Sequence, residues 1–598
     1  MTGNRPIHIA NVSGATGDAP HEMLRMLRDA PDIDAITGDW LSEMNISWNA
    51  IEMRSDPTSG YDAGFLRQFT ESIDLIHERK VKIVTNAGAL NPSQLVLEIR
   101  ALCKQKGYTD LKVAQVDGDN ITSIIPCYKF PHLDHETPIS TWDKEPAVGV
   151  AYIGCRGIVA ALDAGSDIVI CGRCTDASPV IGLAAWWHHW DLDSDLDKLA
   201  AGLIAGHLIE CGPYVAGANF SGFKPYLDSL VDLGFPIAEI SSDGAVVITK
   251  QPNSNGVVLP ETVKCQLLYE LQGELYYNPD VTADLSGITV TGIGPHRVQV
   301  SGVKGLPPPD TTKVLISGIG GYQAEALFFI NGLDVAEKAQ LMRNQLEHAF
   351  KNSEFSKLTI SLIGLPAENP SNQSAGTCLL RVFAQAPTKE GISAAKFKIP
   401  IYAIRMQSYA GYHMDLDFRM MDPRMFMEIW PATIPVAALH ESAILHDGTR
   451  VSASAAKHCI KYPLRRSSYE TANRIPLYEF GPTVDAPLGY IVHARSGDKA
   501  NNSNVGFFVR NADEYPWLQS LMTCERLRSL FGDDISEKTV IERCEFPKIY
   551  AVHFRIMDFL DGGIASSSRI DGLGKGVGEF LRSKYVPLPE KFLSRGRI

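Results

Sequence analysis

The chain has 598 residues, of which 45% are apolar and 21% charged, and its net charge is −13. This composition is typical of a globular protein, and the acidic balance argues against a nucleic-acid-binding surface, which requires a basic stripe. We find no run of about 18 apolar residues, as a membrane span needs, and no basic start followed by an apolar stretch, as a secretory leader has. Eleven cysteines without a disulfide-like spacing predict reduced thiols and a cytoplasmic location.

The first 255 residues alternate strand-like and helical segments, which predicts a mostly parallel sheet covered by helices. Strand-like apolar runs cover residues 7–12, 81–85, 113–116 and 167–170. Helices are expected at residues 20–27, 62–78, 92–106, 147–164, 179–187 and 195–210. A proline-containing stretch at 121–145 interrupts the pattern, and we predict a loop or lid there.

Residues 256–475 are predicted to form a second α/β lobe. Helical patterns occur at 262–271 and 337–350, and strand-like patterns at 288–301, 313–317 and 358–362. Residues 465–479 show no periodicity and indicate a linker.

The last segment, residues 485–598, is predicted to be a self-contained α+β domain of the ferredoxin-like kind. Its two strands, helix, further strands and final helix suit that sandwich, and roughly 110 residues suffice for one core. We therefore predict an α/β protein with a two-lobed body, 1–255 and 256–475, and a small C-terminal α+β ferredoxin-like domain at 485–598.

Four of the predicted strands run into glycine-flanked polar turns, and ligands of open α/β sheets bind at the carboxyl ends of strands. In the first turn, residues 13–18, Gly14 and Thr16 are candidates for substrate binding, because glycines admit a ligand to the backbone and a helix start favours an anion. The turn matches no nucleotide-binding pattern. The alternative is a tight turn with Asp18 as the helix cap.

The other turns supply further candidates. Backbone amides near Asn86 and Gly88 would stabilise an enolate-like oxygen, and Asp119 is a further substrate-binding candidate. Arg173 and Asp176 could hold a carboxylate or phosphate, or form a purely structural ion pair.

His207 and Glu210 lie three residues apart near a predicted helix end, so they share one face. With Asp176 they are the candidates for general acid–base catalysis. The alternative is that His207 interacts with the helix dipole. Cys211 could be a nucleophile beside His207, although sequence neighbours rarely form such a pair.

Two patterns could indicate metal or redox chemistry. Cys171 and Cys174 have C-x-x-C spacing but no second pair, so we expect both to be reduced and unmetallated. Asp39, Asp119 and Asp243 could together bind a divalent cation, but each alone is typical of a turn. We predict no metal ligand, and the sequence leaves the cofactor unidentified.

In the tail, Arg495 and Lys499 lie on one predicted loop, and residues 562–569 form another. If both loops lie at one end of the domain, they form a cationic substrate-binding pocket. The alternative is a rim of solvated charges.

Several of these segments together carry a family resemblance. They are 86–92 (NAGALNP), 172–178 (GRCTDAS), 206–212 (GHLIECG), 236–239 (PIAE) and 266–270 (QLLYE). They resemble the acyclic terpene utilisation (AtuA-like) family, and 494–499 (ARSGDK) resembles its small ferredoxin-like domain. The resemblance implies a role in the catabolism of acyclic terpenes such as citronellol and geraniol, which proceeds through CoA thioesters.

Residue types and resemblance together predict a lyase of the hydratase or dehydratase type. Its substrate would be a branched acyl carboxylate or acyl-CoA thioester, bound without nucleic acid or membrane, and the protein would be a homo-oligomer. Two alternatives stay open: a hydrolase or C–C lyase using Cys211 or a metal-bound water, and a non-catalytic subunit or scaffold for an acyl-CoA enzyme.

Overall fold

A computed structural model describes residues 5–598, and its centre is an 11-stranded sheet. Five neighbouring strands in its middle are parallel: β1 (Ile7–Asn11), β2 (Ala35–Thr37), β3 (Lys82–Thr85), β6 (Ile168–Cys171) and β4 (Val113–Asp117). Antiparallel strands extend both edges: β7 (Pro236–Ile240), β8 (Val246–Lys250), β12 (Arg297–Ser301) and β11 (Thr289–Gly294) on one side, and β19 (Ser442–Ile444) and β20 (Arg450–Ser452) on the other. The sheet is therefore mixed, and the predicted parallel arrangement holds for its centre.

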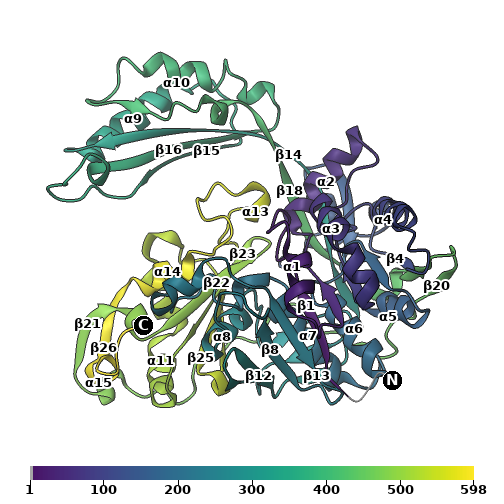
Figure 1. The fold of residues 1–598 in the computed structure, drawn as a ribbon. Coiled ribbons are helices and arrows are strands. Elements are labelled where there is room, and N and C mark those ends of the chain that lie inside the picture. The colour runs from purple at the N-terminus through teal and green to yellow at the C-terminus, as the bar shows by residue number, and fades with distance from the viewer. Residues whose placement is uncertain (1–4) are drawn as a thin grey trace.

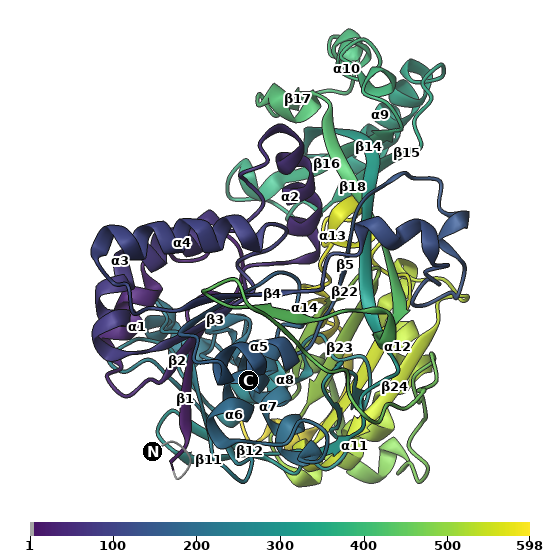
Figure 2. The same ribbon diagram turned by 90° about the vertical axis from the view of Figure 1, so that its right-hand side faces the viewer.

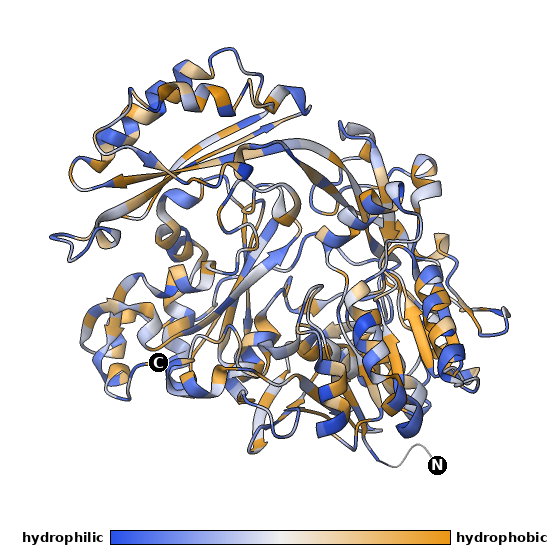
Figure 3. Cartoon of the chain, turned by 45° about the horizontal axis from the view of Figure 1, so that its top comes forward, coloured by the Kyte–Doolittle hydropathy of each residue, from blue (hydrophilic) through white to orange (hydrophobic). Residues whose placement is uncertain are grey.

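Helices cover both faces of this sheet, which explains the apolar runs of the central strands. One face packs on α1 (Glu22–Asp29), α3 (Ala63–Arg79) and α4 (Pro92–Lys106), and the other on α5 (Arg156–Asp163), α6 (Ser178–His188) and α7 (Leu196–Ile209). Figure 2 shows these two layers, and Figure 3 shows the apolar strands between them. Helix α7 is buried almost all round, as expected for a helix apolar on every face.

A second sheet is built on one long strand, β14 (Thr311–Asn331). Near the body, β14 pairs with β5 (Pro146–Ala151) and β18 (Arg424–Pro435). Further along, it pairs with β16 (Thr377–Ala386), which is followed at the edge by β15 (Lys357–Ile363). With α9 (Val335–Ala349) and α10 (Lys398–Ile404) this outer part projects from the body as an arm (Figure 1).

The strands of the predicted second lobe thus join three sheets. β11, β12, β19 and β20 extend the main sheet, β14, β15, β16, β17 (His413–Met414) and β18 belong to the second, and β9 (Leu275–Tyr276), β10 (Thr282–Asp284) and β13 (Lys304–Leu306) form a small third one. The boundaries at 255 and 475 stay a prediction. The stretch 121–145 contains two short 3-10 turns and packs on β14 and β18.

The C-terminal segment folds around a four-stranded antiparallel sheet, ordered β22 (His493–Lys499), β23 (Asn502–Phe508), β25 (Ala551–Ile556) and β24 (Ile541–Phe546). One face packs on α11 (Tyr515–Leu521), α12 (Cys524–Phe531) and α14 (Val577–Arg582). The other face covers α8 (Pro260–Leu268), and the Gly497 backbone approaches the ring of Tyr269 so closely that a Cβ would collide. This contact carries the end of β22 into the body. Among residues 5–598, no helix is both long and apolar enough to cross a membrane.

Candidate active site

A cavity of about 560 Å³ lies where the loops after the parallel strands meet the C-terminal domain. We call it the carboxylate cavity. Its walls come from the loops after β1, β2 and β6, from the end of α7 and from two segments of the C-terminal domain. Its lining includes Gly14, Thr16, Asp39, Glu43, Arg173, Asp176, Glu210, Cys211, Glu270, Asp498, Lys499 and Lys575.

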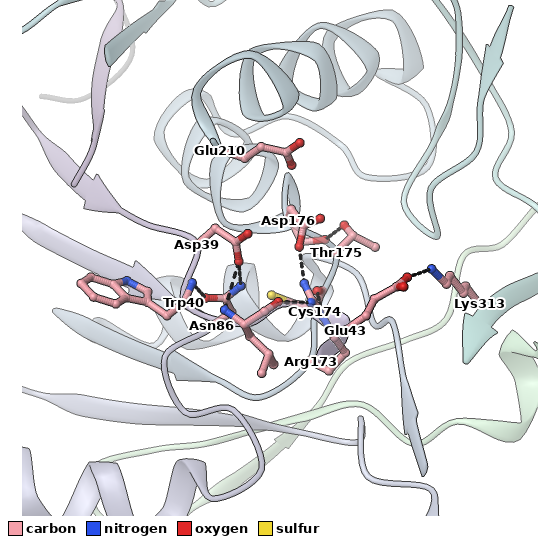
Figure 4. A network of polar contacts seen from close by, with 12 residues as sticks. Asp39, Trp40, Glu43, Asn86, Arg173, Cys174, Thr175, Asp176, Glu210 and Lys313 are labelled. Atoms are coloured by element: carbon pink, nitrogen blue, oxygen red, sulfur yellow. Dashed lines mark hydrogen bonds and ion pairs between the residues drawn. The ribbon is translucent and has the colours of Figure 1, made fainter. Parts of the chain in front are cut away.

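Asp39 follows β2 and is held by the neighbouring loop after β3. The side-chain amide of Asn86 donates a hydrogen bond to Oδ1 of Asp39 at 2.7 Å, and Asn86 Oδ1 accepts one from the backbone N–H of Trp40 at 2.9 Å. Burial and the nearby charge of Asp176 raise the pKa of Asp39 to about 8. A pKa of about 8 favours the protonated form of Asp39 at neutral pH, and Figure 4 shows its carboxyl group beside Asn86.

Asp176 is the ionised partner in the same cavity. Burial alone would raise the pKa of Asp176, but the Arg173 guanidinium together with the charges of Lys499 and Lys313 outweighs burial, and the pKa lies below its usual value. Arg173 is itself buried: it donates to Asp176, to the carbonyl of Leu41 at 2.6 Å and to that of Cys174 at 2.7 Å. The two predicted candidates thus form an ion pair with Asp176 facing the cavity.

Glu210 directly follows α7 and points into the space beside Asp39 and Asp176 (Figure 4). Burial raises the pKa of Glu210 to about 7, although His207 counteracts the shift. His207 is fully buried behind Glu210, with Nδ1 3.3 Å from Oε1 of Glu210 and Nε2 3.1 Å from the Leu267 carbonyl oxygen. His207 does not line the cavity, so it reaches the site through Glu210.

Cations from separate elements pair with two further carboxylates, Glu270 and Glu43, whereas burial raises the pKa of Asp498, which also lines the cavity, to about 8. Lys499, at the end of β22, pairs with Glu270 at 2.7 Å. Lys313, on β14, pairs with Glu43 at 2.5 Å, at the start of α2 (Glu43–Ser55). The C-terminal domain therefore contributes to the cavity lining, and substrate binding by Lys499 stays a prediction.

Four predicted residues lie behind the lining. Asn86 and Asp119 are buried and hold lining residues in place. Asn86 donates a hydrogen bond to Asp39, and Asp119 accepts one from the backbone N–H of Arg173 at 2.7 Å. Burial raises the pKa of Asp119 to about 6. Gly88 packs against the carbonyl of Cys171, away from the cavity lining. Arg495 lies over the rings of Tyr214 and Tyr269, at 4.5 and 4.4 Å.

The predicted oxyanion site near Asn86 and Gly88 does not fit this geometry. The loop is absent from the cavity lining, and the backbone N–H groups of Ala87 and Ala89 already donate to Thr85 and Asn86.

Packing explains why the first turn has a glycine at position 14. A Cβ on Gly14 would lie 2.5 Å from the carbonyl carbon of Cys211, so glycine lets the turn meet the end of α7. Gly14 and Thr16 do line the cavity.

The thiols do not form an activated nucleophile. Burial, followed by the charge of Glu210, raises the pKa of Cys211 well above its usual value, which disfavours the thiolate. Cys171 and Cys174 are buried and not joined in a disulfide. Within residues 5–598 no group of three His, Cys, Asp or Glu side chains converges as metal ligands. Asp243 lies in a turn, where it accepts the backbone N–H of Ala245 at 3.1 Å.

Glu43, Glu270 and Lys313 were not predicted as site residues. They come from three separate segments, and no local pattern marks Glu43 or Lys313. Glu270 ends the segment 266–270 that contributes to the family resemblance, which was the one available signal.

Comparison with known proteins agrees with that resemblance. A family model described as acyclic terpene utilisation family protein AtuA matches residues 7–445, and one described as AtuA ferredoxin-like domain matches residues 486–587. No curated protein and no solved structure matches the chain.

Proposed function

The chain belongs to the acyclic terpene utilisation AtuA family and ends in an AtuA ferredoxin-like domain, and from this premise we propose an enzyme acting on branched acyl compounds. The reaction we propose is addition of water to, or removal of water from, a branched acyl carboxylate or CoA thioester. The observation that carries the proposal is the set of three carboxyl groups, Asp39, Asp176 and Glu210, that share one cavity with different pKa values.

The pKa values divide the roles. Carboxyl groups whose surroundings push their pKa values apart can act as acid and base at one pH. Glu210, with a pKa of about 7, is suited to take a proton from the carbon next to the acyl carbonyl. Asp39, with a pKa of about 8, is suited to protonate the departing hydroxyl group. Asp176 stays ionised beside Arg173 and helps to hold the proton on Asp39.

The elimination balances without any further reactant. The C–H electrons form the new double bond, the C–O bond breaks, and the hydroxyl leaves as water with the proton from Asp39. The reverse sequence adds water. His207 is a positioning residue in this account, since it contacts Glu210 from behind the cavity.

A direct assay tests this function. Purified protein is incubated with 3-methylbut-2-enoyl-CoA, and loss of the conjugated enoyl thioester is followed by absorbance and mass spectrometry. We expect gain of one water by the acyl group. Cleavage of the thioester, or of a carbon–carbon bond, would favour the hydrolase or C–C lyase alternative. Tight binding of an acyl-CoA enzyme without turnover would favour the scaffold alternative.

We also propose that the protein is a homo-oligomer joined through the arm. Large apolar side chains of the arm are exposed, namely Leu333, Leu365, Met406 and Leu416. Strand β15 is an edge strand of its sheet. Exposed apolar groups and open strand edges are typical of association surfaces. Light scattering on the intact protein should give a mass above 65.5 kDa, which Leu365→Asp with Met406→Asp should reduce to the monomer's.

A further inference from the structure

A second cavity of about 230 Å³ adjoins the carboxylate cavity. We call it the side cavity. Tyr152, Asp176, Glu270 and Lys499 line both cavities, so a ligand in the side cavity lies next to the carboxylate cavity and contacts the ionised Asp176. The volume is below the ~300–1,000 Å³ of pockets for drug-sized ligands, which suits a short chain.

The walls of the side cavity are mainly apolar. Leu133, Leu271, Leu275, Tyr276, Tyr462 and Leu464 contribute to them. Leu133 comes from the stretch 121–145, and Tyr462 and Leu464 come from the segment that leads to the C-terminal domain. This apolar part of the wall is suited to a hydrocarbon chain, and polar lining residues such as Thr312 and Asn502 offer points that fix the orientation of a ligand.

The charges that line the side cavity are almost all paired. The pairs are Asp134 with Arg555, Asp176 with Arg173, Glu270 with Lys499, and Lys313 with Glu43. One lining cation, Arg466, has no carboxylate partner among residues 5–598.

The guanidinium of Arg466 is also short of hydrogen-bond acceptors. Its Nε and Nη1 atoms are closed off from solvent and have no partner among the described residues. The group lies over the Tyr277 ring, 3.7 Å from its centre. Burial lowers the pKa of Arg466 to about 10, so the group still carries its charge at neutral pH. Buried donors without acceptors are costly. Nη2 is not closed off in this way, so it is the atom through which the guanidinium can pair with an oxyanion in the side cavity.

We propose that Arg466 binds the oxyanion of a ligand whose short branched apolar chain fills the side cavity. The chemistry is that of a carboxylate or a phosphate group, and the cavity volume favours the carboxylate. The identity of the other, reactive end rests on the function proposed above. The sequence predicts only a linker at residues 465–479. The proposed role of Arg466 follows from its position in the folded protein, where it lines the side cavity.

Calorimetric titration tests the proposal with 3-methylbut-2-enoate and its uncharged amide as a matched pair. Wild-type protein should bind the carboxylate about 10–100-fold more tightly, since hydrogen bonds to charged groups contribute about 1.5–3 kcal/mol. Arg466→Met should lower carboxylate affinity to that of the amide. Arg466→Lys should keep part of the difference, because an ammonium group keeps the positive charge but not the planar shape of the guanidinium. Arg465→Met, at the exposed neighbour, should bind as wild type does.

Equal binding of carboxylate and amide by wild type, or unchanged carboxylate binding by Arg466→Met, would overturn the proposal. If Arg466→Met is unfolded by circular dichroism, Arg466→Lys decides, and affinity equal to that of Arg465→Met would overturn it. Inorganic phosphate that competes only when Arg466 is present would assign the oxyanion to a phosphate group. Glu210→Gln should bind the carboxylate normally, so loss of turnover with intact binding separates failure of the proposed reaction from failure of this site.

Discussion

Nδ1 of His207 lies 3.3 Å from Oε1 of Glu210, while Nε2 lies 3.1 Å from the carbonyl oxygen of Leu267. Because a carbonyl only accepts hydrogen bonds, Nε2 carries a proton. A hydrogen bond between Nδ1 and Glu210 then needs one further proton, which either group can hold. Burial lowers the pKa of His207, but the nearby Glu210 and the Leu267 carbonyl outweigh burial and raise it, so the protonation of the buried imidazole is coupled to the carboxyl group that lines the cavity.

His207→Gln should shift the pH dependence of turnover. The imidazole lowers the pKa of Glu210, so its removal raises that pKa. For removal of water Glu210 must be ionised to act as the base, and the rising limb of kcat/KM against pH, measured in that direction, should therefore move to higher pH. At pH 7 turnover should fall by at least about a hundredfold, within the 10²–10⁴ range of a positioned acid or base.

The matched control for His207→Gln is His188→Gln. His188 ends α6 and its Nε2 lies 2.9 Å from the carbonyl of Ile240, but it does not line the carboxylate cavity. This variant should keep the wild-type pH profile. If both variants melt earlier and both turn over normally, His207 has only a structural role at its helix end.

Asp39→Asn should change how stability depends on pH. The pKa of Asp39 is about 8 in the folded protein against 3.8 as its ordinary value. Its stabilising contribution is therefore complete below about pH 4 and is lost as pH rises toward 8, by up to about 1.4 kcal/mol per pH unit. Asparagine cannot ionise, so the variant should lose less stability across this window.

Urea unfolding at pH 5 and pH 8 measures this effect, with Asp243→Asn in an exposed turn as the control. The difference in unfolding free energy between the two pH values should shrink in Asp39→Asn and stay unchanged in Asp243→Asn. An unchanged difference in Asp39→Asn would mean that Asp39 is ionised at neutral pH and cannot be the proton donor.

The segment 485–598 should fold when expressed alone. Its core, which includes Trp517, Phe507 and Phe554, is formed almost entirely within the segment, and only Phe480 and Leu477 come from the residues just before it. The face that covers α8 would become exposed, so we expect lower solubility than for the whole chain. Circular dichroism and a cooperative melting curve provide the measurement. An unfolded segment would show that the contact with α8 is required for this domain.

Local sequence was sufficient for the centre of the main sheet. The predicted runs 7–12, 81–85, 113–116 and 167–170 coincide with β1, β3, β4 and β6 to within one or two residues, because strands buried on both faces are continuously apolar. The three-residue strand β2 escaped prediction. Residues 147–164, predicted as one helix, form β5 and then α5, because β5 pairs with the distant β14.

The candidate site likewise combines residues whose positions local sequence predicts with residues whose positions depend on distant parts of the chain. The positions of Asp176 and Glu210 follow from local signals, a strand end and a helix end. Which of His207 and Glu210 faces the cavity depends on α8, since the Leu267 carbonyl occupies the other side of His207. Glu43 and Lys313 are 270 positions apart in the chain, and only the path of β14 past α2 brings them together.

The central claim is that Glu210 moves the proton during addition of water. The most direct test is incubation of wild type and Glu210→Gln with 3-methylbut-2-enoyl-CoA in H₂¹⁸O, with ¹⁸O in the acyl group measured by mass spectrometry. The account predicts steady incorporation by wild type and a rate at least about a hundredfold lower in the variant, with both proteins folded. Incorporation by Glu210→Gln at the wild-type rate would contradict it.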